Sequence, residues 1–131
     1  MSDLNSKHNR VVWLDIPVAD LGRACAFYEG VLAVACHREK FEDFEFAVLD
    51  HDQGNGACLM PKPEDITDPN NRPGPMVYFN ADGRIRDALA KVTELGGAVI
   101  QEIHAIGPHG FRAVFTDSEG NRFALHSNTD A

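Results

Sequence analysis

The chain has 131 residues, of which 44% are hydrophobic, so we expect one domain over residues 1–131 that buries a core without disulfides or a structural metal. Its formal net charge is −8, and because phosphate groups bind clustered Lys and Arg, this balance argues against nucleic-acid and anionic-membrane partners. No stretch approaches the roughly 20 apolar residues of a membrane-spanning helix, and the polar start lacks the apolar segment of a signal peptide, so we expect a soluble, cytoplasmic protein.

The first half of the chain predicts a strand, an amphipathic helix and three further strands. Residues 11–18 have the composition of a strand, and Asp20 is placed to cap a helix over residues 21–32. Apolar residues at helical spacing indicate that one face of this helix packs on a sheet. The later strands are expected at residues 33–39, 44–49 and 57–60, with a Gly54-Asn55 turn before the last. We therefore assign residues 11–62 to a first βαβββ module.

The second half repeats this order after a proline-rich linker at residues 61–75, which holds five of the seven prolines. Asp82 is expected to open a helix that runs to Leu95, where Gly96 and Gly97 end it. The strands are expected at residues 76–81, 98–103, 111–116 and 122–126. The second module is thus residues 74–128. The fold class is α+β, with two βαβββ modules that pair into a cup-shaped cleft.

Alternation within the strands predicts which side chains face the helix, because successive residues point to opposite sides of a sheet. The uniformly apolar set should face the helices: Val12, Leu14, Ile16, Val77, Phe79, Ala81, Phe123 and Leu125. The opposite face mixes aromatic, sulfur-containing and a few polar side chains: Trp13, Asp15, Cys58, Met60, Met76, Tyr78, Asn80, Arg122, Ala124 and His126. Cys58 and Met60 are placed there by aligning the Gly54-Asn55 turn with the Gly120-Asn121 turn. Such a mixture is typical of a small-molecule pocket, so we predict that this face lines the cup.

Two titratable residues on this face are weak catalytic candidates. Asp15 could orient a substrate or act as a base, and the alternative is a hydrogen-bonded carboxylate at a dimer edge. His126 could contact a ligand or transfer a proton, and the alternative is a structural histidine. The three cysteines, Cys25, Cys36 and Cys58, form no CxxC pair and are predicted to be reduced thiols.

Two segments resemble the glyoxalase/bleomycin-resistance/dioxygenase superfamily, also called vicinal oxygen chelate proteins. Residues 17–32 contain Val-x-Asp-Leu-x-x-Ala-x-x-Phe-Tyr, and residues 117–126 contain Asp-x-x-Gly-Asn. The resemblance implies two βαβββ modules around a cup-shaped cleft and a homodimer. In the enzymes of the family it also implies a divalent metal, held by His, Gln or Glu on the first and last strands of each module.

The metal-ligand positions implied by the resemblance carry other residues here, namely Trp13, Cys58, Met76 and Ala124. None is His, Gln or Glu, and Trp and Ala side chains cannot bind a divalent metal. We therefore predict no cofactor and no metal site, and a protein that binds an unidentified small molecule through Trp13, Asp15, Cys58, Met60, Met76, Tyr78 and His126. The alternative is a lyase, isomerase or dioxygenase that uses a non-standard divalent metal site, or acid/base catalysis by Asp15 or His126.

Overall fold

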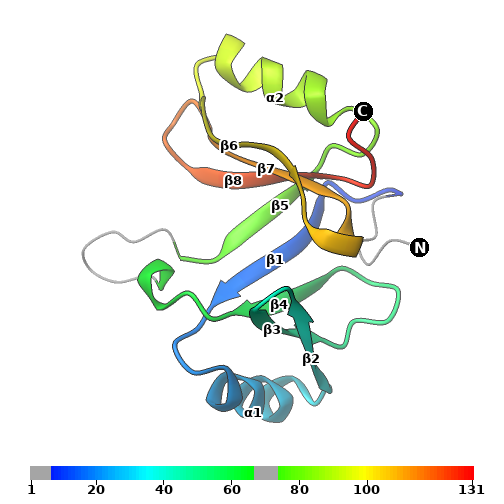
Figure 1. The fold of residues 1–131 in the computed structure, drawn as a ribbon, viewed down its shortest axis with the longest axis vertical. Coiled ribbons are helices and arrows are strands. Elements are labelled where there is room, and N and C mark those ends of the chain that lie inside the picture. The colour runs from blue at the N-terminus through cyan, green and yellow to red at the C-terminus, as the bar shows by residue number, and fades with distance from the viewer. Residues whose placement is uncertain (1–6, 67–73) are drawn as a thin grey trace. The chain divides into compact units, whose positions relative to one another are not determined.

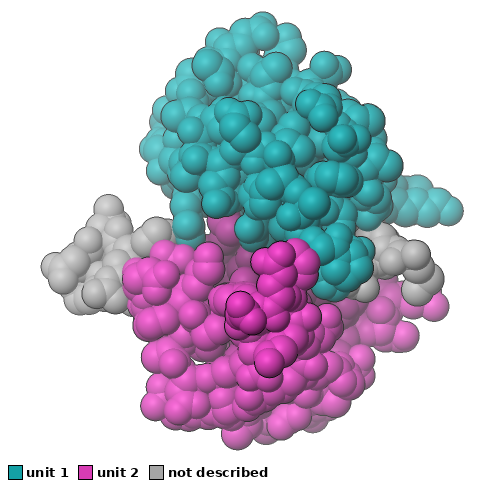
Figure 2. All heavy atoms as spheres, in the orientation of Figure 1, with its two compact units in different colours: residues 1–12, 77–131 teal, residues 13–76 magenta. Residues whose placement is uncertain are grey.

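The computed structural model describes residues 7–66 and 74–131, in which the order strand, helix and three strands occurs twice (Figure 1). The predicted α+β class is therefore confirmed. Contacts within the chain divide it into two compact units, one of residues 13–76 and one of residues 77–131 with residues 1–12 (Figure 2).

The first module is a small sheet with one helix packed on it. In chain order it comprises β1 (Val11–Pro17), α1 (Leu21–Leu32), β2 (Cys36–Phe41), β3 (Phe44–Leu49) and β4 (Gly56–Met60). The strands lie in the order β2-β3-β4-β1, with β1 parallel to β4 and β3 antiparallel to both of its neighbours. Helix α1 contacts β2, β3 and β4 (Figure 1). The parallel β1–β4 pair places residues that are far apart in sequence side by side.

A side-chain cap begins α1, and a residue in the left-handed conformation ends it. The Asp20 carboxylate accepts a hydrogen bond from the Arg23 amide at 2.9 Å, which satisfies one of the free N–H groups of the first turn. The helix ends at Ala33, whose φ of 56° lies in the left-handed region. The helix face packs on the sheet in a cluster whose buried members are Val18, Cys25, Ala47, Leu49 and Leu59.

The second module repeats this arrangement. It comprises β5 (Met76–Asn80), α2 (Ile85–Glu94), β6 (Ala98–Ala105), β7 (Phe111–Thr116) and β8 (Arg122–Ser127). The strands lie in the order β5-β8-β7-β6, with β5 parallel to β8 and β7 antiparallel to both of its neighbours. Helix α2 packs across β6, β7 and β8 (Figure 1).

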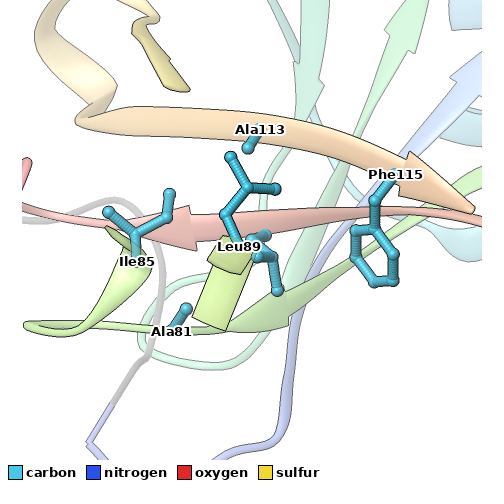
Figure 3. Packing of buried hydrophobic residues seen from close by; sticks show 6 residues of the cluster. Ala81, Ile85, Leu89, Ala113 and Phe115 are labelled. Carbon is cyan, nitrogen blue, oxygen red and sulfur yellow. The ribbon is translucent and has the colours of Figure 1, made fainter. Parts of the chain in front are cut away.

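The core of the second module lies between α2 and its sheet. Ile85 and Leu89 of the helix lie against Ala113 and Phe115 of β7 (Figure 3). Ala81 and Leu125 complete the buried set, and Phe79 and Phe123 pack against it with their rings 4.8 Å apart. Ile16, Phe79, Ala81, Phe123 and Leu125 thus belong to the helix-covered clusters, as strand alternation predicts.

The prediction that Asp82 opens the second helix is wrong. Helix α2 begins at Ile85, and its N-cap residue, Arg84, makes no side-chain capping bond. The Asp82 carboxylate instead accepts hydrogen bonds from the Asn128 amide at 2.7 Å and the Ser127 hydroxyl at 3.4 Å. Gly83, with φ of +77°, reverses the chain between this contact and the helix. Asp82 therefore anchors the segment after β8 rather than the helix.

Other boundaries differ little from prediction. Strands β3 and β7 have the predicted bounds, whereas β2 begins three residues late because Ala33 leaves α1 in the left-handed conformation. Within the predicted linker 61–75, Pro63–Asp65 forms a 3₁₀ turn, and residues 67–73 lie outside the described residues. In the described part of the chain, no helix is long and apolar enough to cross a membrane.

Replacing Ile85 by Ala tests the core of the second module. Ile85 is fully buried, so Ile85→Ala should lower the free energy of unfolding by about 2–5 kcal/mol through lost apolar burial and the cavity left behind. Leu95→Ala is the matched control, because Leu95 is 70% exposed and its loss should change stability by about 0.5 kcal/mol or less. Urea denaturation measures both values. Equal losses in the two variants would contradict this packing.

Candidate functional site

Three predicted site residues meet on the first-module sheet, on the face opposite α1. Asp15 of β1 lies beside Cys58 of β4 in the parallel register. The Cys58 thiol donates a hydrogen bond to Asp15 Oδ1 at 3.0 Å and accepts one from Trp13 Nε1 at 3.3 Å. All three residues are buried, and the Trp13 ring meets the His51 ring edge-on with centroids 5.2 Å apart. We call Trp13, Asp15 and Cys58 the Cys58 cluster.

The Cys58 cluster joins a buried indole to a buried carboxylate. The indole contributes a large apolar area, and its N–H group is satisfied by the sulfur of Cys58. A thiol is both a weak donor and a weak acceptor, so Cys58 can link the indole to the carboxylate of Asp15. A buried carboxylate needs such donors, because burial without them is unfavourable. The cluster therefore holds Asp15 and Trp13 in fixed positions.

The two predicted methionines stand at strand ends. Met60 closes β4 opposite Pro17 in the β1–β4 register, and its carbonyl accepts the Val18 amide at 2.8 Å. Met76 opens β5, and both methionine side chains are half-buried. Their expected role as apolar lining stays a prediction.

A second polar cluster lies on the second-module sheet, opposite α2. Arg112 Nη1 donates to the hydroxyl of buried Tyr78 at 2.9 Å, and Arg112 Nε donates to His104 Nε2 at 3.2 Å. His104 Nδ1 lies 2.8 Å from the carbonyl oxygen of Glu102. These bonds assign the neutral tautomer of His104 with its proton on Nδ1, since Nε2 must accept from Arg112. We call Tyr78, His104 and Arg112 the Arg112 cluster.

The sequence prediction included Tyr78 but missed Arg112 and His104. The signal that could have found Arg112 is the antiparallel register of β7 and β8, in which Arg112 lies opposite His126. Residues opposite each other in a ladder point to the same face, so Arg112 must share the face of His126. His104 lies opposite Arg112 on β6, after two register shifts that the sequence pattern does not reveal.

His126 is fully buried, and the loop before β7 holds it. Its Nε2 lies 2.6 Å from the carbonyl oxygen of His109. Gly110 is required beside it, because its φ is +98° and an added Cβ would lie 2.5 Å from the Ser127 carbonyl oxygen and 3.1 Å from His126 Nε2. This contact holds one ring nitrogen of His126 against the backbone, as expected if His126 is a structural histidine. Its catalytic role stays a prediction.

The positions at which the family resemblance implies metal ligands carry a poor donor set. The Trp13 indole is a donor only, Ala124 has no ligating atom, and the Cys58 sulfur already bonds Trp13 and Asp15. Within residues 7–66 and 74–131, no group of three or more His, Cys, Asp or Glu side chains is placed to hold a metal ion. The described residues therefore do not fit the divalent metal site of the family's enzymes.

The Asp-x-x-Gly-Asn motif forms the turn between β7 and β8. Asp117 Oδ1 accepts the amides of Asn121 at 2.8 Å and Glu119 at 2.9 Å, and Asn121 Nδ2 donates to Oδ2 at 3.1 Å. These bonds, chiefly those from Asn121, hold the pKa of the Asp117 carboxyl below its ordinary value. Gly120 adopts φ of +88°, which the turn requires. The motif is thus a structural turn.

The Asp117→Asn variant tests this turn through its pH dependence. The lowered pKa means that the charged carboxylate stabilises the folded chain above the unfolded pKa of 3.8, and that this effect is lost as pH falls through the folded pKa. Asp117→Asn should therefore lower the urea midpoint near neutral pH, and its difference from the parent should shrink below about pH 4. Asp43→Asn, at an exposed turn position, is the control and should shift the midpoint little. A difference that stays constant with pH would contradict the assignment.

The fold and these clusters define an α+β protein of two βαβββ modules, each with a helix on one face of the sheet and polar side chains on the other. The sequence model of the Glyoxalase/Bleomycin resistance protein/Dioxygenase superfamily matches residues 10–125. The chain belongs to this superfamily, which confirms the resemblance seen in its motifs.

Solved structures share this fold at low sequence identity. Methylmalonyl-CoA epimerase from Streptomyces coelicolor, in complex with 2-nitronate-propionyl-CoA, is 18% identical, with a TM-score of 0.66 over 94% of this chain and 99% of that one. The epimerase from Mycobacterium tuberculosis is 16% identical, with a TM-score of 0.67 over 97% and 91%. A hypothetical protein from Bacillus halodurans is 15% identical, with a TM-score of 0.71 over 95% and 98%. Such identities establish similarity of fold alone. Among curated proteins, none matches this sequence.

Proposed function

We propose that this protein binds a small organic molecule without a divalent metal. The observation that carries the proposal is the Cys58 cluster, in which two of the implied metal-ligand positions are occupied by Trp13 and Cys58, hydrogen-bonded to each other. At these positions the chain has an indole and a carboxylate, each 8% exposed, in place of metal ligands. Binding of this kind needs a few fixed polar groups, and the hydrogen bonds of the cluster fix the Asp15 carboxylate and the Trp13 indole.

The charge of Asp15 limits which ligands the Cys58 cluster can accept. A buried carboxylate repels a second negative charge nearby, so an anionic ligand group is disfavoured beside Asp15. The Trp13 indole offers apolar and aromatic contact. We therefore favour small uncharged aromatic and aliphatic compounds as the first compounds to test.

The proposal predicts ligand binding that a metal chelator does not affect. In a thermal-shift screen of small uncharged aromatic and aliphatic compounds, a compound present at about 100 times its Kd should stabilise the protein by about 2.7 kcal/mol, equally with and without EDTA. Metal analysis of protein purified without chelators should give no stoichiometric divalent ion. A bound ion whose removal abolishes the thermal shift would overturn the proposal.

The Trp13→Leu variant asks whether the Cys58 cluster is the binding surface. Leu keeps an apolar side chain but removes the indole area and the bond to Cys58, so the ligand-induced shift should fall by at least half. The matched control is Phe27→Leu, because Phe27 is an aromatic residue of α1 that is 58% exposed. The control should keep the full shift. Unchanged shifts in Trp13→Leu would place binding elsewhere.

A second candidate function is acid–base catalysis by Asp15 on a small carbonyl compound. The specific observation is the buried Asp15 carboxylate with the Cys58 thiol 3.0 Å from its Oδ1, and the fold shared with methylmalonyl-CoA epimerases gives a substrate class to try. If it is correct, the wild type should exchange the α-proton of an acyl thioester for solvent deuterium, and Asp15→Asn should lower that rate by about 100-fold or more. Absence of exchange by the folded wild type would exclude this function for the thioesters tested.

A further inference from the structure

Two cysteines for which the sequence predicted no contact lie side by side in the structure. Cys25 comes from the middle of α1 and Cys36 is the first residue of β2, and the Cys36 thiol donates a hydrogen bond to Cys25 Sγ at 2.8 Å. Both thiols are free. A disulfide has an S–S distance of about 2.05 Å, so the two sulfurs would need to approach by only about 0.8 Å.

Packing of α1 on the sheet holds this pair in place. Cys25 is buried in the first-module cluster with Ala47 and Leu49, and Cys36 packs against the same cluster. The Cys36 amide donates to Glu29 Oε2 at 3.0 Å, which ties the start of β2 to the helix a second time. The two sulfurs are thus positioned by regular elements rather than by a loose loop.

We propose that Cys25 and Cys36 form a reversible disulfide that links α1 to β2 when the protein meets a peroxide. The Cys36 thiolate attacks a peroxide oxygen and gives a sulfenic acid with loss of water or alcohol. The Cys25 thiol then attacks the Cys36 sulfur, forms the S–S bond and expels water. Two thiols and one hydrogen peroxide become one disulfide and two waters, and a dithiol such as dithiothreitol reverses the change.

Exposure assigns the first step to Cys36. Its side chain is half-buried, whereas Cys25 is 8% exposed, so a peroxide reaches Cys36 more easily. Burial, followed by the neighbouring Cys25 and by Glu29, raises the pKa of Cys36, and Arg38 opposes this shift only in part. The thiol form therefore predominates at neutral pH, and oxidation should become faster as pH rises.

The third cysteine provides an internal comparison. Cys58 is buried in the Cys58 cluster, where its partners are Trp13 and Asp15. It should remain a thiol while the Cys25–Cys36 pair is oxidised. The proposed disulfide is independent of the proposed function, because it uses different residues on the helix-covered face.

Peptide mapping tests the disulfide directly. The full chain is treated with hydrogen peroxide, denatured without reductant, alkylated and digested with trypsin. Residues 24–38 form one tryptic peptide that contains both cysteines, and Glu29 lies between them. A disulfide should leave this peptide unalkylated and lighter by two hydrogen atoms, and cleavage after Glu29 should give two fragments that separate only on reduction. The peptide with Cys58 should be alkylated.

Two variants supply the controls. Cys36→Ser, at a half-buried position of β2, should abolish the disulfide in this peptide. Cys25→Ala, in α1, should abolish it as well. Oxidation should raise the Tm of the wild type by about 5–10 °C, as expected for closing a short loop, and should leave the Tm of Cys36→Ser unchanged. Alkylation of all three cysteines after peroxide treatment, Cys36 sulfinic acid beside a free Cys25, or disulfide-linked dimers would each overturn the proposal.

Discussion

The structure depends on one helix covering one face of a four-stranded sheet, in each half of the chain. Because strand side chains alternate, burying Ile16, Leu59, Phe79 or Leu125 under a helix necessarily turns their neighbours to the other face. That second face carries Asp15, Cys58, Tyr78 and His126. Apolar burial under the helices therefore determines which face carries the polar groups of the Cys58 and Arg112 clusters.

Much of the fold could be predicted because its signals are local. Asp20 caps α1 through its own side chain, and strand composition with turn signals predicted eight strands, each of which overlaps a strand of the described residues. Asp82 misled the prediction because its partners, Ser127 and Asn128, lie more than forty residues away in sequence. A carboxylate before a helix can accept a hydrogen bond from the first amides of the helix or from a distant amide. Tertiary structure determines which of these bonds forms.

The candidate site was predictable in part for the same reason. Alternation placed Trp13 and Asp15 on one face, and alignment of the two Gly-Asn turns placed Cys58 there. The hydrogen bonds that unite the three residues require the parallel register of β1 and β4. Arg112 and the pair of Cys25 with Cys36 escaped prediction, because each depends on a neighbour set by sheet register or by helix packing. Residue types and periodicity indicate which face a side chain takes. They do not indicate which side chain it meets there.

The turn at Asp117 contains the motif by which the chain resembles its family, and the residues of this turn differ from those of the Cys58 cluster. Its carboxylate is satisfied by the backbone and side chain of Asn121, so the Asp-x-x-Gly-Asn motif serves a tight reversal of the chain. Positions such as Trp13 and Cys58 have no part in that reversal. Because the turn is held by hydrogen bonds among its own residues, a match to this turn identifies the fold and says nothing about the reactive groups on the sheet.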